Sequence, residues 1–229
     1  MLRPALILAA HLIAILAPIF LGWGLSDLPA FFAQPARAGL ILLIAVGAIA
    51  VLILRIDLDP LRTGTPATTV ESRTLLALTA CSILLLAFLP YADRHHILTI
   101  EGAAGQQHLQ NALPWLGVLL CAVAGLVRIL ALRELGNHFS AYVTLQPSHQ
   151  LIQTGVYSVI RHPLYLSLLL AGPGVALIFA SHLVWPIAAA AAVFTADRIR
   201  LEEILLAQAF PSAFPAYRDS TSALLPFIL

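Results

Sequence analysis

Long apolar runs alternate with short polar segments along the whole chain. A membrane-spanning helix needs roughly 20 apolar residues, and six runs are candidates. They cover residues 5–25, 38–54, 74–91, 113–132, 163–181 and 183–196. The last run is short, so the polar stretch that follows it must begin close to the membrane or slightly within it. The pattern predicts an all-α fold, a polytopic membrane helix bundle with about six transmembrane helices.

The last two runs are expected to form a C-terminal helical hairpin. Only the short segment SHLVWP separates them, and Pro186 suits the first turn of the returning helix. Gly172, Pro173 and Gly174 interrupt the fifth run, which predicts a kink or a close contact with another helix. We therefore expect two domains: residues 1–112 with three spans, and residues 113–229 with a polar connector and the hairpin.

Composition supports a membrane protein and excludes several partners. The chain has 229 residues, 60% of them hydrophobic and 10% charged, and its mean hydropathy of +0.94 lies outside the range of soluble domains. A net charge of +1 gives no electrostatic footprint for nucleic acid. No obligate protein partner is expected. Cys81 and Cys121 both lie in apolar runs, where a thiol behaves as a small hydrophobe.

The arginines give the expected orientation. Six spans place both termini on one side of the membrane, with Arg37 and Arg94 on one side and the other ten arginines on or near the opposite side. By the positive-inside rule, the arginine-rich side is cytoplasmic. All basic residues are Arg in a chain rich in Ala and Leu, which favours a bacterial source and hence the inner membrane. The first run is interpreted as a retained helix, not a signal peptide.

Two polar clusters are expected to meet at the cytoplasmic side. In RHPLY, Pro163 suits the first position of a helix, whose free N–H groups at Leu164 and Tyr165 attract an anion. Alternatively, Arg161 and His162 are ordinary interfacial anchors.

The second cluster, DRIRLEE, leaves the membrane after the short sixth run. Arg198 and Glu202 are four residues apart and share one helix face. A surface ion pair is the simpler interpretation, but ionisable groups so near the lipid are costly and usually functional.

The sequence from LGNHFSAYVTLQPSHQLIQTGVYSVIRHPLY to DRIRLEEILLAQAFPSAFPAY resembles the isoprenylcysteine carboxyl methyltransferase family, which has phospholipid methyltransferase relatives. The resemblance covers about the last hundred residues. Here Pro211 and Phe214 depart from a Gly and a Tyr of the family pattern. That departure concerns acceptor preference more than cofactor binding.

The resemblance implies a membrane methyltransferase with S-adenosylmethionine as cofactor in a cytoplasmic pocket. It implies that Arg198 contacts the acceptor, a lipid-like or prenylated substrate beside membrane lipids. The cofactor-binding residues that it implies are Thr144, His149, Gln150, Leu151, Ile152, Tyr157, His162, Pro163, Leu164, Tyr165 and Glu202.

The chemistry of methyl transfer leaves the acceptor open. A carboxylate is already ionised at pH 7 and needs only a cation, for which Arg198 and Arg161 are candidates. An amine must lose a proton, and Glu203 is the candidate base. We expect carboxyl methylation of an isoprenylcysteine-like acceptor, with phospholipid amine methylation as the alternative.

Two other functions stay open. A sterol-reductase-like enzyme would need a nicotinamide cofactor and a larger cytoplasmic pocket. A small transporter or assembly protein would also place charges at a membrane edge. His95, His96 and His108 lie in one polar loop, and neutral imidazoles bind Zn or Cu. Without Cys or carboxylate partners, these three are expected to be solvated, and no metal is predicted.

Overall fold

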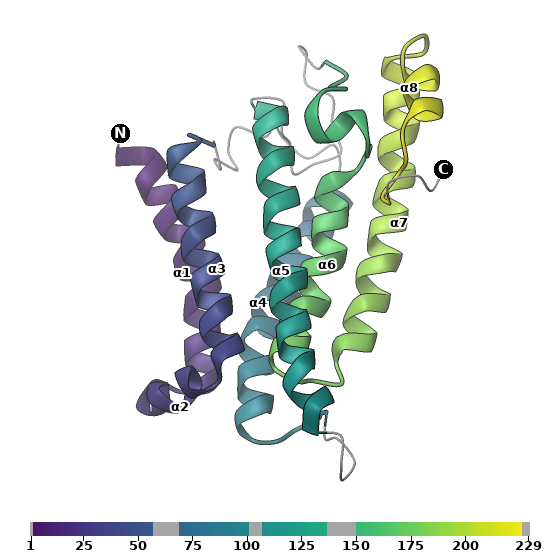
Figure 1. The fold of residues 1–229 in the computed structure, drawn as a ribbon. Helices are drawn as coiled ribbons and strands as arrows, with labels where there is room; N and C mark the ends of the chain where they lie inside the picture. Colours follow the sequence, from purple (N-terminus) through teal and green to yellow (C-terminus); the bar gives the residue numbers. More distant parts are fainter. Residues whose placement is uncertain (1, 57–68, 101–106, 137–149, 226–229) are drawn as a thin grey trace.

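Long helices run up and down beside one another through the molecule (Figure 1). The computed structural model describes residues 2–56, 69–100, 107–136 and 150–225. The six long helices are α1 (Leu2–Trp23), α3 (Pro35–Ile53), α4 (Thr69–Arg94), α5 (Gln107–Leu135), α6 (Pro163–Ile178) and α7 (Val184–Ala209). Shorter elements connect or follow them: η1 (Leu25–Asp27), α2 (Leu28–Ala33), η4 (Gly155–Ser158) and α8 (Phe214–Ser220). The described residues form no β-strand, so the all-α prediction is confirmed.

Within the described residues, three helices are long and apolar enough to cross a membrane. They are Ala5–Trp23, Pro35–Ile53 and Asn111–Leu135, and between 11% and 22% of each span is buried inside the protein. Pro163–Ile178 is apolar but shorter. Their exposed apolar faces need a lipid environment, so the chain is a multi-pass membrane protein. Each of the six predicted runs coincides with a long helix, while the count of six spans remains a prediction.

Local signals explain where several helices begin. Gln34 precedes α3, and its side-chain oxygen accepts a hydrogen bond from the Ala36 N–H at 2.7 Å, with Pro35 in the first turn. In contrast, α5 begins at Gln107, so it includes polar residues ahead of the apolar run. The division predicted between residues 112 and 113 therefore lies within a helix, and the two-domain description stays a prediction.

The contact between α5 and α6 depends on glycine. A Cβ atom on Gly117 would lie 2.5 Å from the Gly174 carbonyl oxygen, and one on Gly174 would lie 2.8 Å from the Cys121 sulfur. Side chains at these positions would push the helices apart, because backbone cannot yield as a flexible side chain can. The close helix contact predicted for this part of α6 is confirmed.

The apolar core and the polar site lie at opposite ends. Buried side chains of α1 and α2, including Ile19, Trp23 and Phe31, pack with Phe179 at the end of α6. At the other end, α5 and α7 end and α6 begins (Figure 1). We call this the connector end. There α7 packs on α6 and α8, which brings the two predicted polar clusters together.

Candidate active site

The segment before α6 has the predicted geometry. His162 is the N-cap residue with φ −124° and ψ 57°, and Pro163 is the first helical residue. The first intrahelical bond in α6 runs from the Leu166 N–H to the His162 carbonyl at 3.1 Å. A helix leaves its first N–H groups without intrahelical partners, so Leu164 and Tyr165 offer backbone donors at the connector end.

His162 lies between two carboxylates of α7. Its side chain is almost completely buried, and its Nε2 atom lies 3.2 Å from Oε1 of Glu203. Its Nδ1 atom is 3.8 Å from Oε2 of Glu202, beyond hydrogen-bonding distance. Nδ1 is buried and has no hydrogen-bond partner in the described part of the chain. The Glu202 side chain keeps 37% of its surface exposed, so it remains accessible to a ligand.

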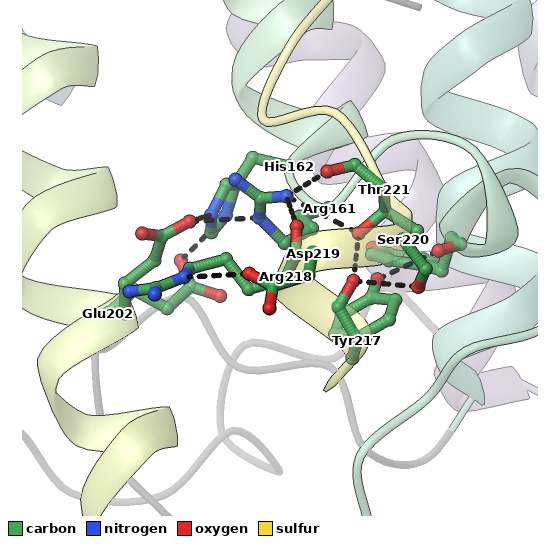
Figure 2. Close-up of polar contacts among 10 residues, drawn as sticks. Arg161, His162, Glu202, Tyr217, Arg218, Asp219, Ser220 and Thr221 are labelled. Atoms are coloured by element: carbon green, nitrogen blue, oxygen red, sulfur yellow. Dashed lines mark hydrogen bonds and ion pairs between the residues drawn. The ribbon is translucent and has the colours of Figure 1, made fainter. Parts of the chain in front are cut away.

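Arg161 is held by contacts inside the protein (Figure 2). Its Nε donates to Oε1 of Glu203 at 3.0 Å. Its Nη1 donates to the Arg218 carbonyl at 2.7 Å and to the Thr221 carbonyl. The hydrogen bond from His162, followed by that from Arg161, lowers the pKa of Glu203 despite the opposing effect of burial.

Tyr165 joins the two residues expected to bind donor and acceptor. Its hydroxyl lies close enough to both Arg198 and Glu202 to interact with each of these charged side chains. Its ring also lies 5.9 Å, centroid to centroid, from that of His162. Tyr165 and Glu202 are thus close enough to contact one small molecule, as the predicted site requires.

Tyr157 closes the connector side of this cluster. It lies in η4 with 7% of its surface exposed, and its carbonyl accepts a hydrogen bond from the Tyr217 hydroxyl at 2.8 Å. Burial, followed by the charge of Glu202, raises the pKa of Tyr157. This phenol therefore remains a neutral donor at ordinary pH.

The connector, which is the segment between α5 and α6, is described only in part. Gln150 is exposed, whereas Leu151 and Ile152 are half-buried on the way into η4. Thr144 and His149 lie outside the described residues. The structure thus brings most of the predicted residues to one place, and the roles of all the predicted residues stay predictions. The gathered set is Tyr157, Arg161, His162, Pro163, Leu164, Tyr165, Arg198, Glu202 and Glu203.

Residues outside the predicted set support the site from a distance. Glu134 at the end of α5 accepts a hydrogen bond from the Thr154 hydroxyl at 2.9 Å. Gly155 follows with φ +57°, and a Cβ atom there would lie 2.4 Å from the Glu134 carboxyl group. Gly155, two positions before Tyr157, was a visible signal for this turn, since only Gly adopts such a backbone freely.

A second overlooked residue is Thr195 on α7. It is 1% exposed, and its hydroxyl has no hydrogen-bond partner among the described residues. It precedes Arg198 by three positions and Glu202 by seven, so the three share one face of the helix. A hydroxyl inside an otherwise apolar run was the available signal.

The histidine loop does not form a comparable cluster in the described residues. His95 stacks on Tyr91, with ring centroids 4.4 Å apart. Within the described ranges, no group of three His, Cys or acidic side chains gathers in a way that could hold a metal ion.

Comparisons with known proteins agree with the motif. Residues 115–208 match the model of the isoprenylcysteine carboxyl methyltransferase (ICMT) family. That segment runs from α5 through the connector and α6 to the end of α7, and it contains every residue gathered at the site.

Two curated relatives are each similar over about half of the chain. A protein-S-isoprenylcysteine O-methyltransferase of Saccharomyces cerevisiae is 33% identical over 124 residues, which cover 49% of this chain and 48% of the relative. Protein-S-isoprenylcysteine O-methyltransferase A of Arabidopsis thaliana is 29% identical over 119 residues, or 49% and 58% of the two chains. The chain thus spans about half the length of the curated relatives that it matches.

One solved structure is also similar. It is the eukaryotic intramembrane Ras methyltransferase ICMT without a monobody, with a TM-score of 0.47 and 19% identity over 86% of this chain and 80% of that chain. The two curated relatives are eukaryotic, so they do not support the bacterial inner membrane expected from composition. The predicted resemblance itself is confirmed: residues 115–208 match the model of the isoprenylcysteine carboxyl methyltransferase family.

Proposed function

We propose that the protein is an integral membrane methyltransferase that uses S-adenosylmethionine and methylates the carboxylate of an isoprenylcysteine-like acceptor. The observation that supports this most is the position of the Tyr165 hydroxyl beside both Arg198 and Glu202. This position brings the proposed acceptor residue and the proposed donor residue together at one end of α6 and α7.

The residues at the connector end suit the amino acid part of S-adenosylmethionine. Glu202 is part-exposed and carries the charge that an ammonium group needs. The Leu164 and Tyr165 N–H groups suit a carboxylate at the start of α6. The buried Nδ1 atom of His162, which no described residue satisfies, is a further hydrogen-bonding position for a ligand. When bound, the cofactor supplies a methyl group on a sulfonium centre.

Arg198 is proposed to bind the acceptor carboxylate. It lies one turn from Glu202 on the side of α7 that leads into the apolar run. Arg161 is the other candidate cation, but its Nε and Nη1 atoms already donate hydrogen bonds to Glu203 and two backbone carbonyls. Arg198 then orients the acceptor beside the donor, and positioning of this kind is the main requirement of a displacement reaction.

The state of Glu203 favours a carboxylate over an amine. An amine acceptor requires a base, and Glu203 is the available carboxylate. Its hydrogen bonds from His162 and Arg161 lower its pKa, which makes it a weaker base. A carboxylate needs no proton removed, so it fits this site without further assistance.

We also propose six membrane spans, with α6 and α7 as a hairpin and the connector end in the cytoplasm. The arginine distribution supports this orientation through the positive-inside rule. An apolar acceptor then enters from the bilayer while the water-soluble donor enters from the cytoplasm.

The test is incubation of the purified protein with methyl-labelled S-adenosylmethionine and either farnesyl-cysteine analogues or phospholipids. We expect base-labile label on the farnesyl-cysteine analogues, as a methyl ester gives. Transfer only to phospholipid amines would replace the proposed acceptor. The absence of transfer to both would contradict the proposed function.

A further inference from the structure

The segment after α8 lies alongside the residues that lead into α6. It pairs with them as a short parallel bridge between Ile160 and Ser222. Three backbone hydrogen bonds hold the pairing: Ser222 N–H to the Val159 carbonyl at 3.1 Å, Arg161 N–H to the Ser222 carbonyl at 2.9 Å, and His162 N–H to the Ala223 carbonyl at 3.1 Å. We call residues 217–223, which comprise the end of α8 and the segment after it, the C-terminal clasp. It fixes the backbone of the two residues that lead directly into α6.

Side chains reinforce this pairing. Thr221 and Ser222 are each 4% exposed, and Tyr217 is 5% exposed. The Tyr217 hydroxyl donates to the Tyr157 carbonyl at 2.8 Å. Burial raises the pKa of Tyr217 to about 12, so the hydroxyl keeps its proton and the hydrogen bond persists at ordinary pH. The clasp is therefore attached to the connector at two points, one at η4 and one at the start of α6.

Arg161 links the clasp to the carboxylates of α7. Its Nη1 atom donates to the carbonyls of Arg218 and Thr221 (Figure 2). Its Nε atom donates to Glu203. The same Glu203 oxygen accepts from Nε2 of His162. Any displacement of the clasp must therefore move Arg161, and with it the partner that orients His162.

We infer that the C-terminal clasp sets the geometry of the donor site, and that Arg161 is a positioning residue that transmits this effect to Glu203 and His162. The inference rests on the proposed function. It assigns to residues 217–223, which lie beyond the segment that matches the family, a role in binding S-adenosylmethionine without contact to it.

The substitution Arg161→Lys separates this role from direct contact with the acceptor. A lysine carries one nitrogen and cannot span Glu203 and the two carbonyls as a planar guanidinium does. We expect the dissociation constant of S-adenosylmethionine, measured by calorimetry in detergent, to rise about tenfold, with the KM of the farnesyl-cysteine acceptor unchanged at saturating donor. A raised acceptor KM with unchanged donor affinity would overturn the inference.

Tyr217→Phe tests the clasp without altering a charge. Loss of one hydrogen bond to the connector is expected to raise the donor dissociation constant about threefold. Tyr91→Phe is the matched control, because that tyrosine lies on α4 at the opposite end, and it should leave donor affinity unchanged. If Tyr217→Phe lowers only the unfolding temperature, the clasp is merely structural and the inference is wrong.

Wild-type binding separates the two hypotheses. If the wild type binds S-adenosylmethionine and both variants bind it equally well, only the clasp inference fails. If the wild type does not bind it, the proposed function fails and the inference falls with it. Should Arg161→Lys fail to fold, Tyr217→Phe still decides the question.

Discussion

The protein has a polar cluster of arginines and carboxylates at each end of the bundle, and the two differ in how fully they are closed. At the end opposite the connector, Arg37 forms an ion pair of 2.7 Å with Asp93, and the two side chains are 13% and 11% exposed. The Arg37 guanidinium lies 4.4 Å from the centre of the Trp23 ring, and that of Arg94 lies 5.8 Å from it. This cluster ties α1, α3 and α4 together.

The cluster at the connector end uses the same residue types but stays partly open. Glu202 is 37% exposed and lies 3.8 Å from His162, whereas Glu203 is closely bound to Arg161. One carboxylate is thus committed to the fold and its neighbour is available for a ligand. The comparison teaches that an ion pair at a membrane edge does not by itself identify a site, and that the accessible carboxylate of Glu202 is what makes the connector end the better candidate.

The largest effect is expected from opening the closed cluster. Asp93→Asn leaves the Arg37 charge without its counter-ion in a nearly buried position, which should lower the free energy of unfolding by about 3 kcal/mol. Thermal unfolding in detergent measures this. Asp27→Asn is the control, because its pair with Arg94 is 3.9 Å long and half-exposed, and it should cost less than about 1 kcal/mol. Equal losses would refute the proposed difference between the pairs.

A smaller effect is expected from Thr195, which shares one face of α7 with Arg198 and Glu202. Thr195→Val keeps the shape and removes the unsatisfied hydroxyl, so we expect the acceptor KM to rise about fivefold. Thr195→Ser should stay close to the wild type. Ser167→Ala on α6 is the control, since that hydroxyl already donates to the Leu164 carbonyl at 2.7 Å. An unchanged KM in Thr195→Val would remove this residue from the site.

The smallest effect concerns pH, which should act on the closely bound carboxylate at the connector end. Hydrogen bonds from His162 and then Arg161 lower the pKa of Glu203 below 4.5, so its stabilising contribution is lost as the pH falls below that value.

Unfolding temperatures of Glu203→Gln and of the wild type between about pH 3.5 and 6 test this effect. The deficit of Glu203→Gln relative to the wild type should shrink towards low pH. A deficit that stays constant across this range would contradict the lowered pKa of Glu203.

Local patterns predicted much of this arrangement. Apolar runs located the six long helices, Pro163 located the start of α6, and the spacing of Arg198 and Glu202 located one helix face. Each of these signals acts within a few residues of the chain, where sterics and helix periodicity decide the outcome.

The contacts that could not be predicted join distant segments. Tyr217 and Tyr157 are 60 residues apart, and Glu134 and Thr154 are 20 apart. No local sequence pattern predicts such contacts, because they depend on how helices pack after they have formed. For the same reason, the chemistry of methyl transfer left both Arg161 and Arg198 as candidate cations, and the contacts that hold Arg161 inside the protein agree with the assignment of Arg198 that the resemblance implies.

Calorimetric titration of S-adenosylmethionine into the wild type, Glu202→Gln and Asp93→Asn tests the central claim most directly. We predict that the wild type binds the cofactor, that Glu202→Gln binds it at least about tenfold more weakly through loss of a charge-assisted contact, and that folded Asp93→Asn binds it as the wild type does. Unchanged affinity in Glu202→Gln, or a matching loss in Asp93→Asn, would contradict a donor site at the connector end.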